Sequence, residues 1–395
     1  MPNKKKQVLT GLDLIEKLWP RDLKGARTGF VVHPASLDGR LRHAVSLCTT
    51  SKKFKAAALF GPQHGILGQT QDNMIEWEGF RDPATGLPVY SLYGRTRKPL
   101  PGMLDNLDVL VIDLQDVGSR YYTFIWTLEL CMQACHEAGK TVIVLDRPNP
   151  LGGVMTEGPL LDPDYASFVG LRPLPVRHGM TIGEIGLYLC AEFYPGLDFR
   201  VITMQGWKRK MWYDGTGLPW VMPSPNMPTI ETAAVYPGMC LLEATNISEG
   251  RGTTRPFEIF GAPFIQPDTL VKVLNDFKLP GVTFRPLSFL PTFQKHANTL
   301  CGGAQIHVTD REKFKPFKTG VAILKAIHNT WPREFAWKQP PYEYEEVKMP
   351  IDILAGRDRL RKEIEAWKDL DGMEKWWKAE AKAFEKIRKR YLIYK

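Results

Sequence analysis

Short apolar runs alternate with helical stretches along this sequence, and this alternation constrains the fold more than any other feature. The runs lie at residues 27–32, 55–60, 89–92, 109–112, 141–145 and 199–204, and helices are expected at 11–18, 42–49, 121–138 and 182–193. Dense runs of Val, Ile and Leu are typical of strands buried on both faces. The alternation predicts an α/β fold with a Rossmann-like, doubly wound and mostly parallel sheet.

Polar residues directly follow four of these predicted strands. The clusters are His33, Gln63 with His64, Gln115 with Asp116, and Asp146 with Arg147 and Asn149. Parallel strands bring their carboxyl ends to one edge of the sheet, and ligands bind in the crevice outside that edge. The four loops are therefore predicted to converge on one site.

A second set of elements begins near residue 265. Helices are expected at 268–277, 317–330, 357–367 and 373–392, with strands at 282–286 and 304–309. We therefore predict two domains, a Rossmann-like catalytic domain over 1–264 and a smaller C-terminal α/β domain over 265–395 that closes the cleft. The run at 238–245 is expected to form one more strand, and the proline-rich segment 223–229 a fixed loop.

Composition narrows the function classes. The formal net charge is +9, but no nucleic-acid motif accompanies it, so an anionic small ligand or simple solubility explains the charge better. No run of eighteen apolar residues and no apolar signal-peptide core is present, so no membrane span is expected. The chain as given is expected to be cytoplasmic, with export through a removed signal as the alternative.

Cofactor motifs are absent from the sequence. The six cysteines form no CxxC pair and no zinc spacing, which predicts buried free thiols in a reducing compartment. Neither GxGxxG nor GxxxxGK[ST] follows any predicted strand, so phosphate-loop nucleotide binding is disfavoured. No cofactor and no metal ion are expected.

Several long motifs resemble one family. They are LFGPQHG at 59–65, GLPVYSLYG at 86–94, DLQDVGSRYYT at 113–123, LDRPNP at 145–150, YASFVGLRPLPVRHGMTIGE at 165–184, PSPNMPT at 223–229, NISEGRGTTRPFE at 246–258 and RKRYLIY at 388–394. The chain resembles the exo-β-N-acetylmuramidases of the NamZ (YbbC-like) type. This resemblance implies a Rossmann-like domain plus a smaller domain, an active site in the cleft between them, and release of N-acetylmuramic acid from the non-reducing end of peptidoglycan fragments. The implied partner is a peptidoglycan-derived sugar or muropeptide.

One departure from the family pattern affects the chemistry. The family usually has Pro-Glu-His-Gly, with the glutamate as its expected acid, where this chain has Gln63 followed by His64. A glutamine side chain cannot exchange a proton at neutral pH. Another carboxyl group would then supply the proton, and the candidates are Glu76, which is the first choice, and Asp72, Asp116 and Glu249. Arg120 beside Asp116 would keep that carboxyl ionised, which suits a base or an orienting group.

Substrate binding is expected from polar residues of the same loops. Arg120, Arg147 and Arg251 are candidates for the lactyl carboxylate of muramic acid, because a forked guanidinium matches a carboxylate. The other expected substrate-binding residues are His33, Asp72, Asn73, Tyr122, Asn149, His178, Asn226 and Thr253.

Two alternatives stay open at this point. The first is a catalytically weak muropeptide- or amino-sugar-binding protein, which Gln63 favours. The second is a metal hydrolase that uses His33, His64, His178 and Asp116, but these residues come from separate loops without ligand spacing. The oligomeric state is likewise open.

Overall fold

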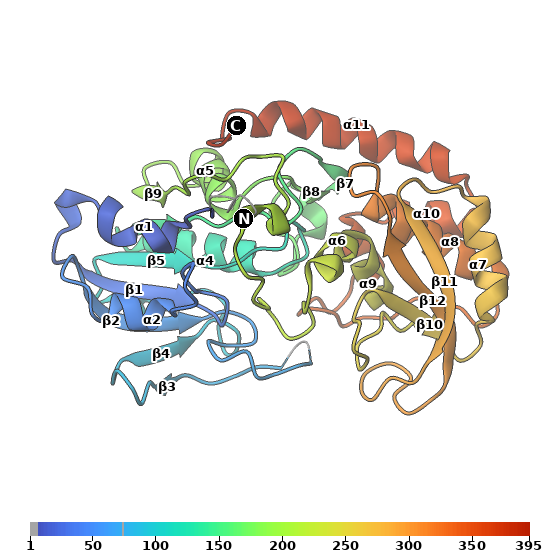
Figure 1. Cartoon of the computed structure of the whole chain (residues 1–395), viewed down its shortest axis with the longest axis horizontal. Coiled ribbons are helices and arrows are strands. Elements are labelled where there is room, and N and C mark those ends of the chain that lie inside the picture. The colour runs from blue at the N-terminus through green and yellow to red at the C-terminus, as the bar shows by residue number, and fades with distance from the viewer. Residues whose placement is uncertain (1–6, 73–74) are drawn as a thin grey trace, which may run out of the picture.

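The structure is a computed structural model that describes residues 7–72 and 75–395. Two α/β halves lie side by side, and a long C-terminal helix runs along one edge of both (Figure 1). The first half is built on a seven-stranded sheet of order β3-β4-β2-β1-β5-β6-β9, in which only β3 is antiparallel to its neighbour. Its strands are β1 (Arg27–Val32), β2 (Lys55–Gly61), β3 (Phe80–Arg81), β4 (Pro88–Ser91), β5 (Val109–Asp113), β6 (Thr141–Leu145) and β9 (Phe199–Ile202).

Helices cover both faces of this sheet. They are α1 (Gly11–Leu18), α2 (Ala44–Cys48), α3 (Pro101–Leu104), α4 (Phe124–Glu137) and α5 (Ile182–Phe193). Along β5, Val109 and Val111 belong to the apolar cluster that contains α1, whereas Leu110 and Ile112 belong to the cluster that contains α4. Successive side chains of one strand therefore enter two separate apolar layers, which explains why β5 is apolar throughout.

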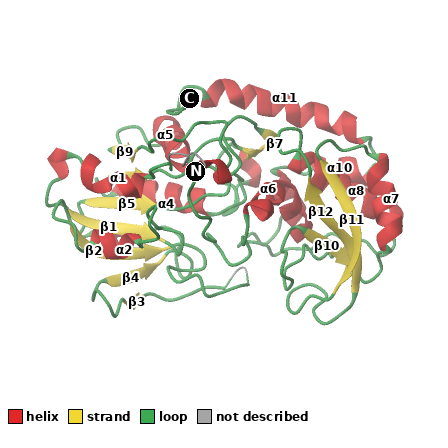
Figure 2. Cartoon of the chain, in the orientation of Figure 1, coloured by secondary structure: helices red, strands yellow, loops and turns green. Residues whose placement is uncertain are grey.

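The second half has a three-stranded antiparallel sheet of order β10-β12-β11, with helices packed against it (Figure 2). Its elements are α6 (Ile230–Met239), β10 (Ile259–Ala262), α7 (Pro267–Asp276), β11 (Val282–Phe289), β12 (Cys301–Val308), α8 (Pro316–Thr330), α9 (Pro350–Ala355), α10 (Arg359–Glu365) and α11 (Leu370–Arg388). A two-stranded ribbon of β7 (Glu157–Leu160) and β8 (Pro175–Arg177) lies beside α11. The predicted α/β class, with a mostly parallel main sheet and a smaller second sheet, is confirmed.

The strand predicted at 238–245 is wrong. This segment is the end of α6 followed by a 3₁₀-helix over Cys240–Ala244, and its residues are buried on all sides. A short apolar run without alternation does not distinguish a buried strand from a buried helix. Strand β10 lies before the boundary predicted at residues 264 and 265, and its pairing with β12 assigns it to the second sheet.

The C-terminal segment after α11 returns to the first half. The Tyr394 hydroxyl donates to Asp146 Oδ2 at 2.6 Å, and the Arg209 amide donates to the Lys395 carbonyl at 2.9 Å. These bonds tie the two halves together on the side where β6 ends. Within residues 7–72 and 75–395, no helix is long and apolar enough to cross a membrane.

Candidate active site

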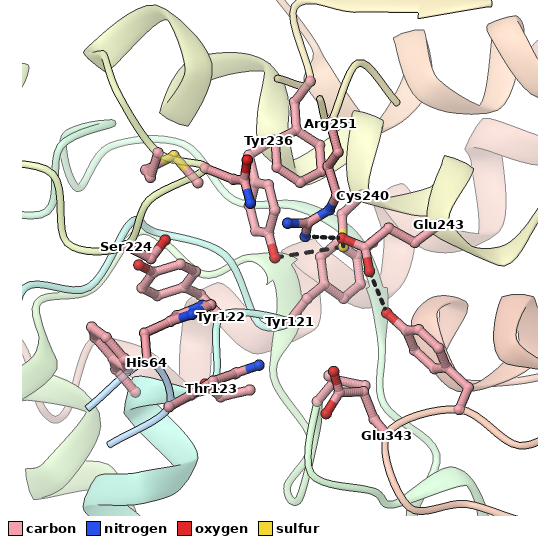
Figure 3. A pocket seen from close by; sticks show the side chains of 17 residues that line it. His64, Tyr121, Tyr122, Thr123, Ser224, Tyr236, Cys240, Glu243, Arg251 and Glu343 are labelled. Atoms are coloured by element: carbon pink, nitrogen blue, oxygen red, sulfur yellow. Dashed lines mark hydrogen bonds and ion pairs between the residues drawn. The ribbon is translucent and has the colours of Figure 1, made fainter. Parts of the chain in front are cut away.

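A small pocket lies at the carboxyl ends of the main sheet and is lined by residues of both halves of the molecule (Figure 3). Gln63 and His64 reach it from the loop after β2, and Tyr122 from the loop after β5. The second half contributes Glu243, Arg251, Tyr342 and Glu343, while Ser224 and Asn226 come from the proline-rich loop.

Gln63 is held by hydrogen bonds at both ends of its amide. Its Oε1 accepts from the Thr123 hydroxyl at 2.8 Å, and its Nε2 donates to the Tyr93 hydroxyl at 3.2 Å. In this orientation of the amide the Thr123 hydroxyl donates, and Tyr93 accepts from Gln63 and keeps its own proton for another acceptor.

His64 is presented to the pocket in a strained backbone conformation, with φ at +68°. Such values are uncommon for residues other than glycine and concentrate at functional sites. Its Nδ1–H donates to the Thr70 carbonyl at 2.9 Å, so Nε2 carries the free lone pair. Burial lowers the pKa of His64 to about 4, so the ring is neutral at physiological pH and can accept a hydrogen bond.

Arg251 lies between two buried carboxylates. Its Nη2 donates to Glu243 Oε1 at 2.8 Å, and its Nε lies 3.2 Å from Glu249 Oε1. Lys295 Nζ contacts the other oxygen of Glu249 at 2.9 Å. Although burial favours the neutral acid, the charges of Lys295 and Arg251 lower the pKa of Glu249, so this carboxylate is ionised.

Glu343 enters the pocket from a tight turn of the second half. The amides and carbonyls of Tyr342 and Glu345 bond each other at 2.9 Å, and the central residues Glu343 and Tyr344 have φ of +45° and +68°. Positive φ at both central positions is the geometry of a type I′ turn, which is unusual without glycine or asparagine. The Tyr93 hydroxyl donates to Glu343 Oε2 at 3.2 Å. Burial, with the nearby charge of Glu243, raises the pKa of Glu343 to about 7.

Asp116 and His178 lie below the pocket, next to Tyr122. Asp116 Oδ2 accepts from the Gly118 amide at 2.7 Å and lies 3.2 Å from His178 Nε2. The Met180 amide donates to His178 Nδ1, so Nε2, the nitrogen that faces Asp116, carries a hydrogen. Among the described residues, Asp116 Oδ1 is buried without a hydrogen-bond partner. Buried polar atoms of this kind are free to bind a ligand or water.

Comparison with known proteins identifies the family. The model of the N-terminal domain of exo-beta-N-acetylmuramidase NamZ matches residues 28–231, and the model of its C-terminal domain matches residues 234–394. This protein belongs to the NamZ family. The chain is 48% identical over 391 residues to the peptidoglycan beta-N-acetylmuramidase NamZ of Bacillus subtilis (strain 168). The matched region covers 99% of this chain and 92% of that protein.

Two solved structures of DUF1343 family proteins from Bacteroides fragilis NCTC 9343 share the fold of this NamZ family member. The first superposes with a TM-score of 0.88 at 32% identity and covers 98% of this chain and 99% of that one. The second has a TM-score of 0.77 at 29% identity and covers 99% of both chains. The arrangement of both halves is therefore that of the family.

Arg147 and Arg120, both predicted to bind the substrate carboxylate, lie outside the pocket lining. The Arg147 guanidinium binds both oxygens of Asp113, at 2.5 and 2.8 Å, and the Leu37 carbonyl at 3.0 Å. Arg120 donates to the carbonyls of Pro159, Leu174 and Leu354 rather than to Asp116. Both guanidinium groups are buried by the protein's own acceptors and lie outside the pocket lining, so neither is available to a sugar carboxylate.

Other predicted residues support the site from outside its lining. Asn149 bonds the Met180 carbonyl and the Leu151 amide, at 2.8 and 2.9 Å. His33 accepts from the Gln115 amide at 2.9 Å and stacks on Phe124, with ring centroids 4.9 Å apart. Thr253 donates to the Gly250 carbonyl at 2.6 Å within its own loop. These three side chains fix loop conformations, whereas Asn226 and Tyr122 do line the pocket.

The loop after His64 does not supply the acid that was predicted there. Glu76 has a side chain that is 52% exposed, and it accepts from the Tyr344 hydroxyl at 3.2 Å outside the pocket. Asp72 accepts from Gln294 of the second half. Asn73, also predicted to bind substrate, lies outside the described residues.

Sequence reasoning missed Glu243, Tyr342 and Glu343. Polar residues at strand ends marked only the side of the pocket that the main sheet provides. The available signal was the run Glu343-Tyr344-Glu345-Glu346, in which acids and an aromatic residue follow Pro340-Pro341. Within the part of the chain that the structure describes, no group of three or more His, Cys, Asp or Glu side chains is placed to bind a metal ion.

Proposed function

We propose that this protein is a glycoside hydrolase, an exo-β-N-acetylmuramidase that releases N-acetylmuramic acid from the non-reducing end of peptidoglycan fragments. The observation that carries the proposal is the composition of the pocket, in which a buried guanidinium and a buried carboxyl group lie in one enclosed space. The 48% identity to a protein named peptidoglycan beta-N-acetylmuramidase supports it.

Arg251 is the proposed partner of the lactyl carboxylate. Burial disfavours its charge, but Glu243 and Glu249 raise the pKa of Arg251 above its ordinary value, so the side chain remains a cation. One terminal nitrogen binds Glu243, and Figure 3 shows the other turned away from Glu243 into the pocket. A guanidinium has five donors, so a substrate carboxylate can still be bound beside the two existing ion pairs.

The chemistry requires an acid at the leaving oxygen and a group that attacks or positions the attacking species. In a substrate with a 2-acetamido group, either water or the substrate's own amide oxygen reaches the anomeric carbon. The neutral His64, with its free Nε2, is placed in the pocket to accept a proton or a hydrogen bond during this step. Asp116 lies outside the pocket lining, with Oδ2 3.2 Å from His178 Nε2.

The proposed compartment is the cytoplasm. All six cysteines are free thiols, and five of them are buried, which is typical of proteins in a reducing environment. The proposed partner is a peptidoglycan-derived sugar or muropeptide, and no nucleic acid is proposed as a ligand.

The test compares two chromogenic substrates, the 4-nitrophenyl β-glycosides of N-acetylmuramic acid and of N-acetylglucosamine. We expect the purified protein to release 4-nitrophenol from the muramide and to act far more slowly on the glucosaminide, which lacks the lactyl carboxylate. Binding of N-acetylmuramic acid without hydrolysis of either glycoside would instead identify a binding protein, the alternative that Gln63 raises.

A further inference from the structure

We propose that Glu343, supplied by the turn at 342–345 of the second half, is the general acid that protonates the leaving oxygen. This inference rests on the proposed hydrolase function. Gln63 cannot donate the proton, and Glu343 takes that role. Gln63 then serves as a positioning residue for Glu343.

Two carboxyl groups near Glu343, those of Glu243 and Glu249, contact cations. Glu243 accepts from Arg251 at 2.8 Å through Oε1 and from the Tyr342 hydroxyl at 2.9 Å through Oε2. Glu249 lies between Arg251 and Lys295. The charges of Lys295 and Arg251 stabilise the ionised form of Glu249, and both oxygens of Glu243 are engaged by neighbouring donors, so both residues suit substrate positioning better than proton donation.

Glu343 has the opposite environment. It is buried, it lines the pocket, and the Tyr93 hydroxyl bonds its Oε2. Among residues 7–72 and 75–395, no side chain or backbone group donates a hydrogen bond to its Oε1. Burial beside the negative Glu243 favours the protonated carboxyl group, which agrees with a pKa raised to about 7. A donor in this range is suited to proton transfer near neutral pH.

The position of the Glu343 proton follows from a directed chain of hydrogen bonds. Thr123 donates to Gln63 Oε1, Gln63 Nε2 donates to the Tyr93 hydroxyl, and Tyr93 therefore donates onward to Glu343 Oε2. Because Oε2 is an acceptor in this chain, the acidic proton resides on Oε1. A carboxylate at position 63 would compete with Glu343 for the Tyr93 proton.

The turn that carries Glu343 is fixed against the first half. Tyr344 packs edge-on against Tyr93, with ring centroids 5.9 Å apart, and the Arg97 guanidinium lies 3.0 Å from the centroid of the Tyr344 ring. Two successive residues with positive φ are held by these contacts. Strain of this kind persists where the surrounding structure enforces it, commonly at functional sites.

The proposed step conserves atoms and charge. Glu343 transfers its Oε1 proton to the glycosidic oxygen while the bond from the anomeric carbon to that oxygen breaks, and the electron pair leaves with the oxygen of the departing alcohol. The anomeric carbon forms its new bond to water, or first to the substrate's own amide oxygen, which water then displaces. A proton from that water returns to the Glu343 carboxylate, so the sum of the reaction is hydrolysis of one glycosidic bond.

The test uses Glu343→Gln with two leaving groups of different acidity. General acid catalysis typically contributes about 10²–10⁴-fold, so we expect a loss of that size on a muropeptide disaccharide, whose alcohol needs a proton. On the 2,4-dinitrophenyl muramide, whose phenol departs without one, we expect less than about a tenfold loss, since the acid contributes little there. Glu346→Gln is the matched control, because Glu346 is an exposed acid of the same run. This variant should hydrolyse both substrates like the wild type.

Each outcome is decisive. If the wild type hydrolyses neither muramide, the proposed function itself is wrong. If the wild type is active and Glu343→Gln loses the same factor on both leaving groups, or loses nothing, Glu343 is not the acid. Retained affinity for N-acetylmuramic acid shows that the variant pocket is folded.

Gln63→Glu provides an independent measurement if Glu343→Gln does not fold. We expect its rate on the disaccharide to fall, because the hydrogen-bond chain to Glu343 is disrupted. A rate above that of the wild type would show that position 63 is the site of a lost acid, and it would overturn the assignment to Glu343.

Discussion

Glu343 in the pocket and Asp146 at the junction with the C-terminal segment are two buried carboxyl groups with similar acidity and different surroundings. Burial raises the pKa of each to about 7. Asp146 accepts four hydrogen bonds, from the amides of Arg147 and Gly183 at 3.0 and 2.9 Å and from the hydroxyls of Thr181 and Tyr394 at 2.8 and 2.6 Å. Glu343 accepts one from within residues 7–72 and 75–395, from Tyr93 at 3.2 Å.

The difference shows that a displaced pKa does not by itself identify a reacting group. Asp146 uses both oxygens to join β6, α5 and the C-terminal segment, and no oxygen is left for a ligand. Glu157, whose pKa is also raised to about 7 by burial, likewise accepts from the Phe317 and Lys318 amides at the start of α8. An unfilled acceptor position facing a pocket, added to the displaced pKa, is what distinguishes Glu343.

The strongest way to test this contrast is to replace each carboxyl group by its amide and measure unfolding in urea. Asp146→Asn offers one oxygen to four donors, so two buried donors lose their acceptor, and we expect a loss of about 2–6 kcal/mol in the free energy of unfolding. Glu343→Gln keeps the acceptor for Tyr93, so its loss should stay below about 1 kcal/mol. Equal losses for the two variants would contradict the distinction between a structural and a reacting carboxyl group.

The pH dependence of hydrolysis tests the same contrast in the wild type. Only the protonated form of Glu343 donates, so kcat/KM on a muropeptide disaccharide should be flat just below pH 7 and fall about tenfold per unit above it. The Glu343→Gln variant should lack this alkaline decline. A decline that persists in Glu343→Gln would have to come from another group and would remove this support for Glu343.

Strand ends in the sequence predicted the main-sheet side of the pocket because local patterning determines it. Gln63, His64 and Tyr122 follow β2 and β5 and do reach the pocket. The same rule misassigned Arg147, because polar residues at strand ends also bind each other, and its partner Asp113 ends the neighbouring strand. A strand-end pattern identifies the location of a site. It does not distinguish the residues that bind substrate from the residues that hold the loops in place.

Strand-end patterns could not predict the pocket residues that come from the second half of the molecule. Glu243 and Glu343 are brought to the main sheet by the packing of one half on the other, with Tyr344 seated against Tyr93 across a long sequence separation. No local periodicity encodes that contact. Glu76 was preferred as the acid because it is close to Gln63 in sequence, yet it lies outside the pocket.

Arg251 and Arg147 test, with a smaller expected effect, the difference between a residue that binds the substrate and one that supports the fold. Arg251→Lys replaces the forked donor in the pocket, and we expect affinity for N-acetylmuramic acid to weaken by about 1–3 kcal/mol, the range for hydrogen bonds to charged groups. Arg147→Lys should leave that affinity unchanged and reduce stability instead, because its partner is the buried Asp113. Isothermal titration of both variants measures the affinity. An unchanged affinity in Arg251→Lys would exclude it as the carboxylate partner.

The smallest expected effect comes from the hydroxyl that links Gln63 to Glu343. A hydrogen bond from Tyr93 favours the ionised form of Glu343, so Tyr93→Phe should raise the pKa of Glu343 further. A bond of about 1 kcal/mol corresponds to somewhat less than one pH unit, and the alkaline decline of kcat/KM should move upward by that amount. A decline that moves to lower pH in Tyr93→Phe would mean that the Tyr93 hydroxyl stabilises the protonated acid, and the direction assigned to the hydrogen-bond chain would then be wrong.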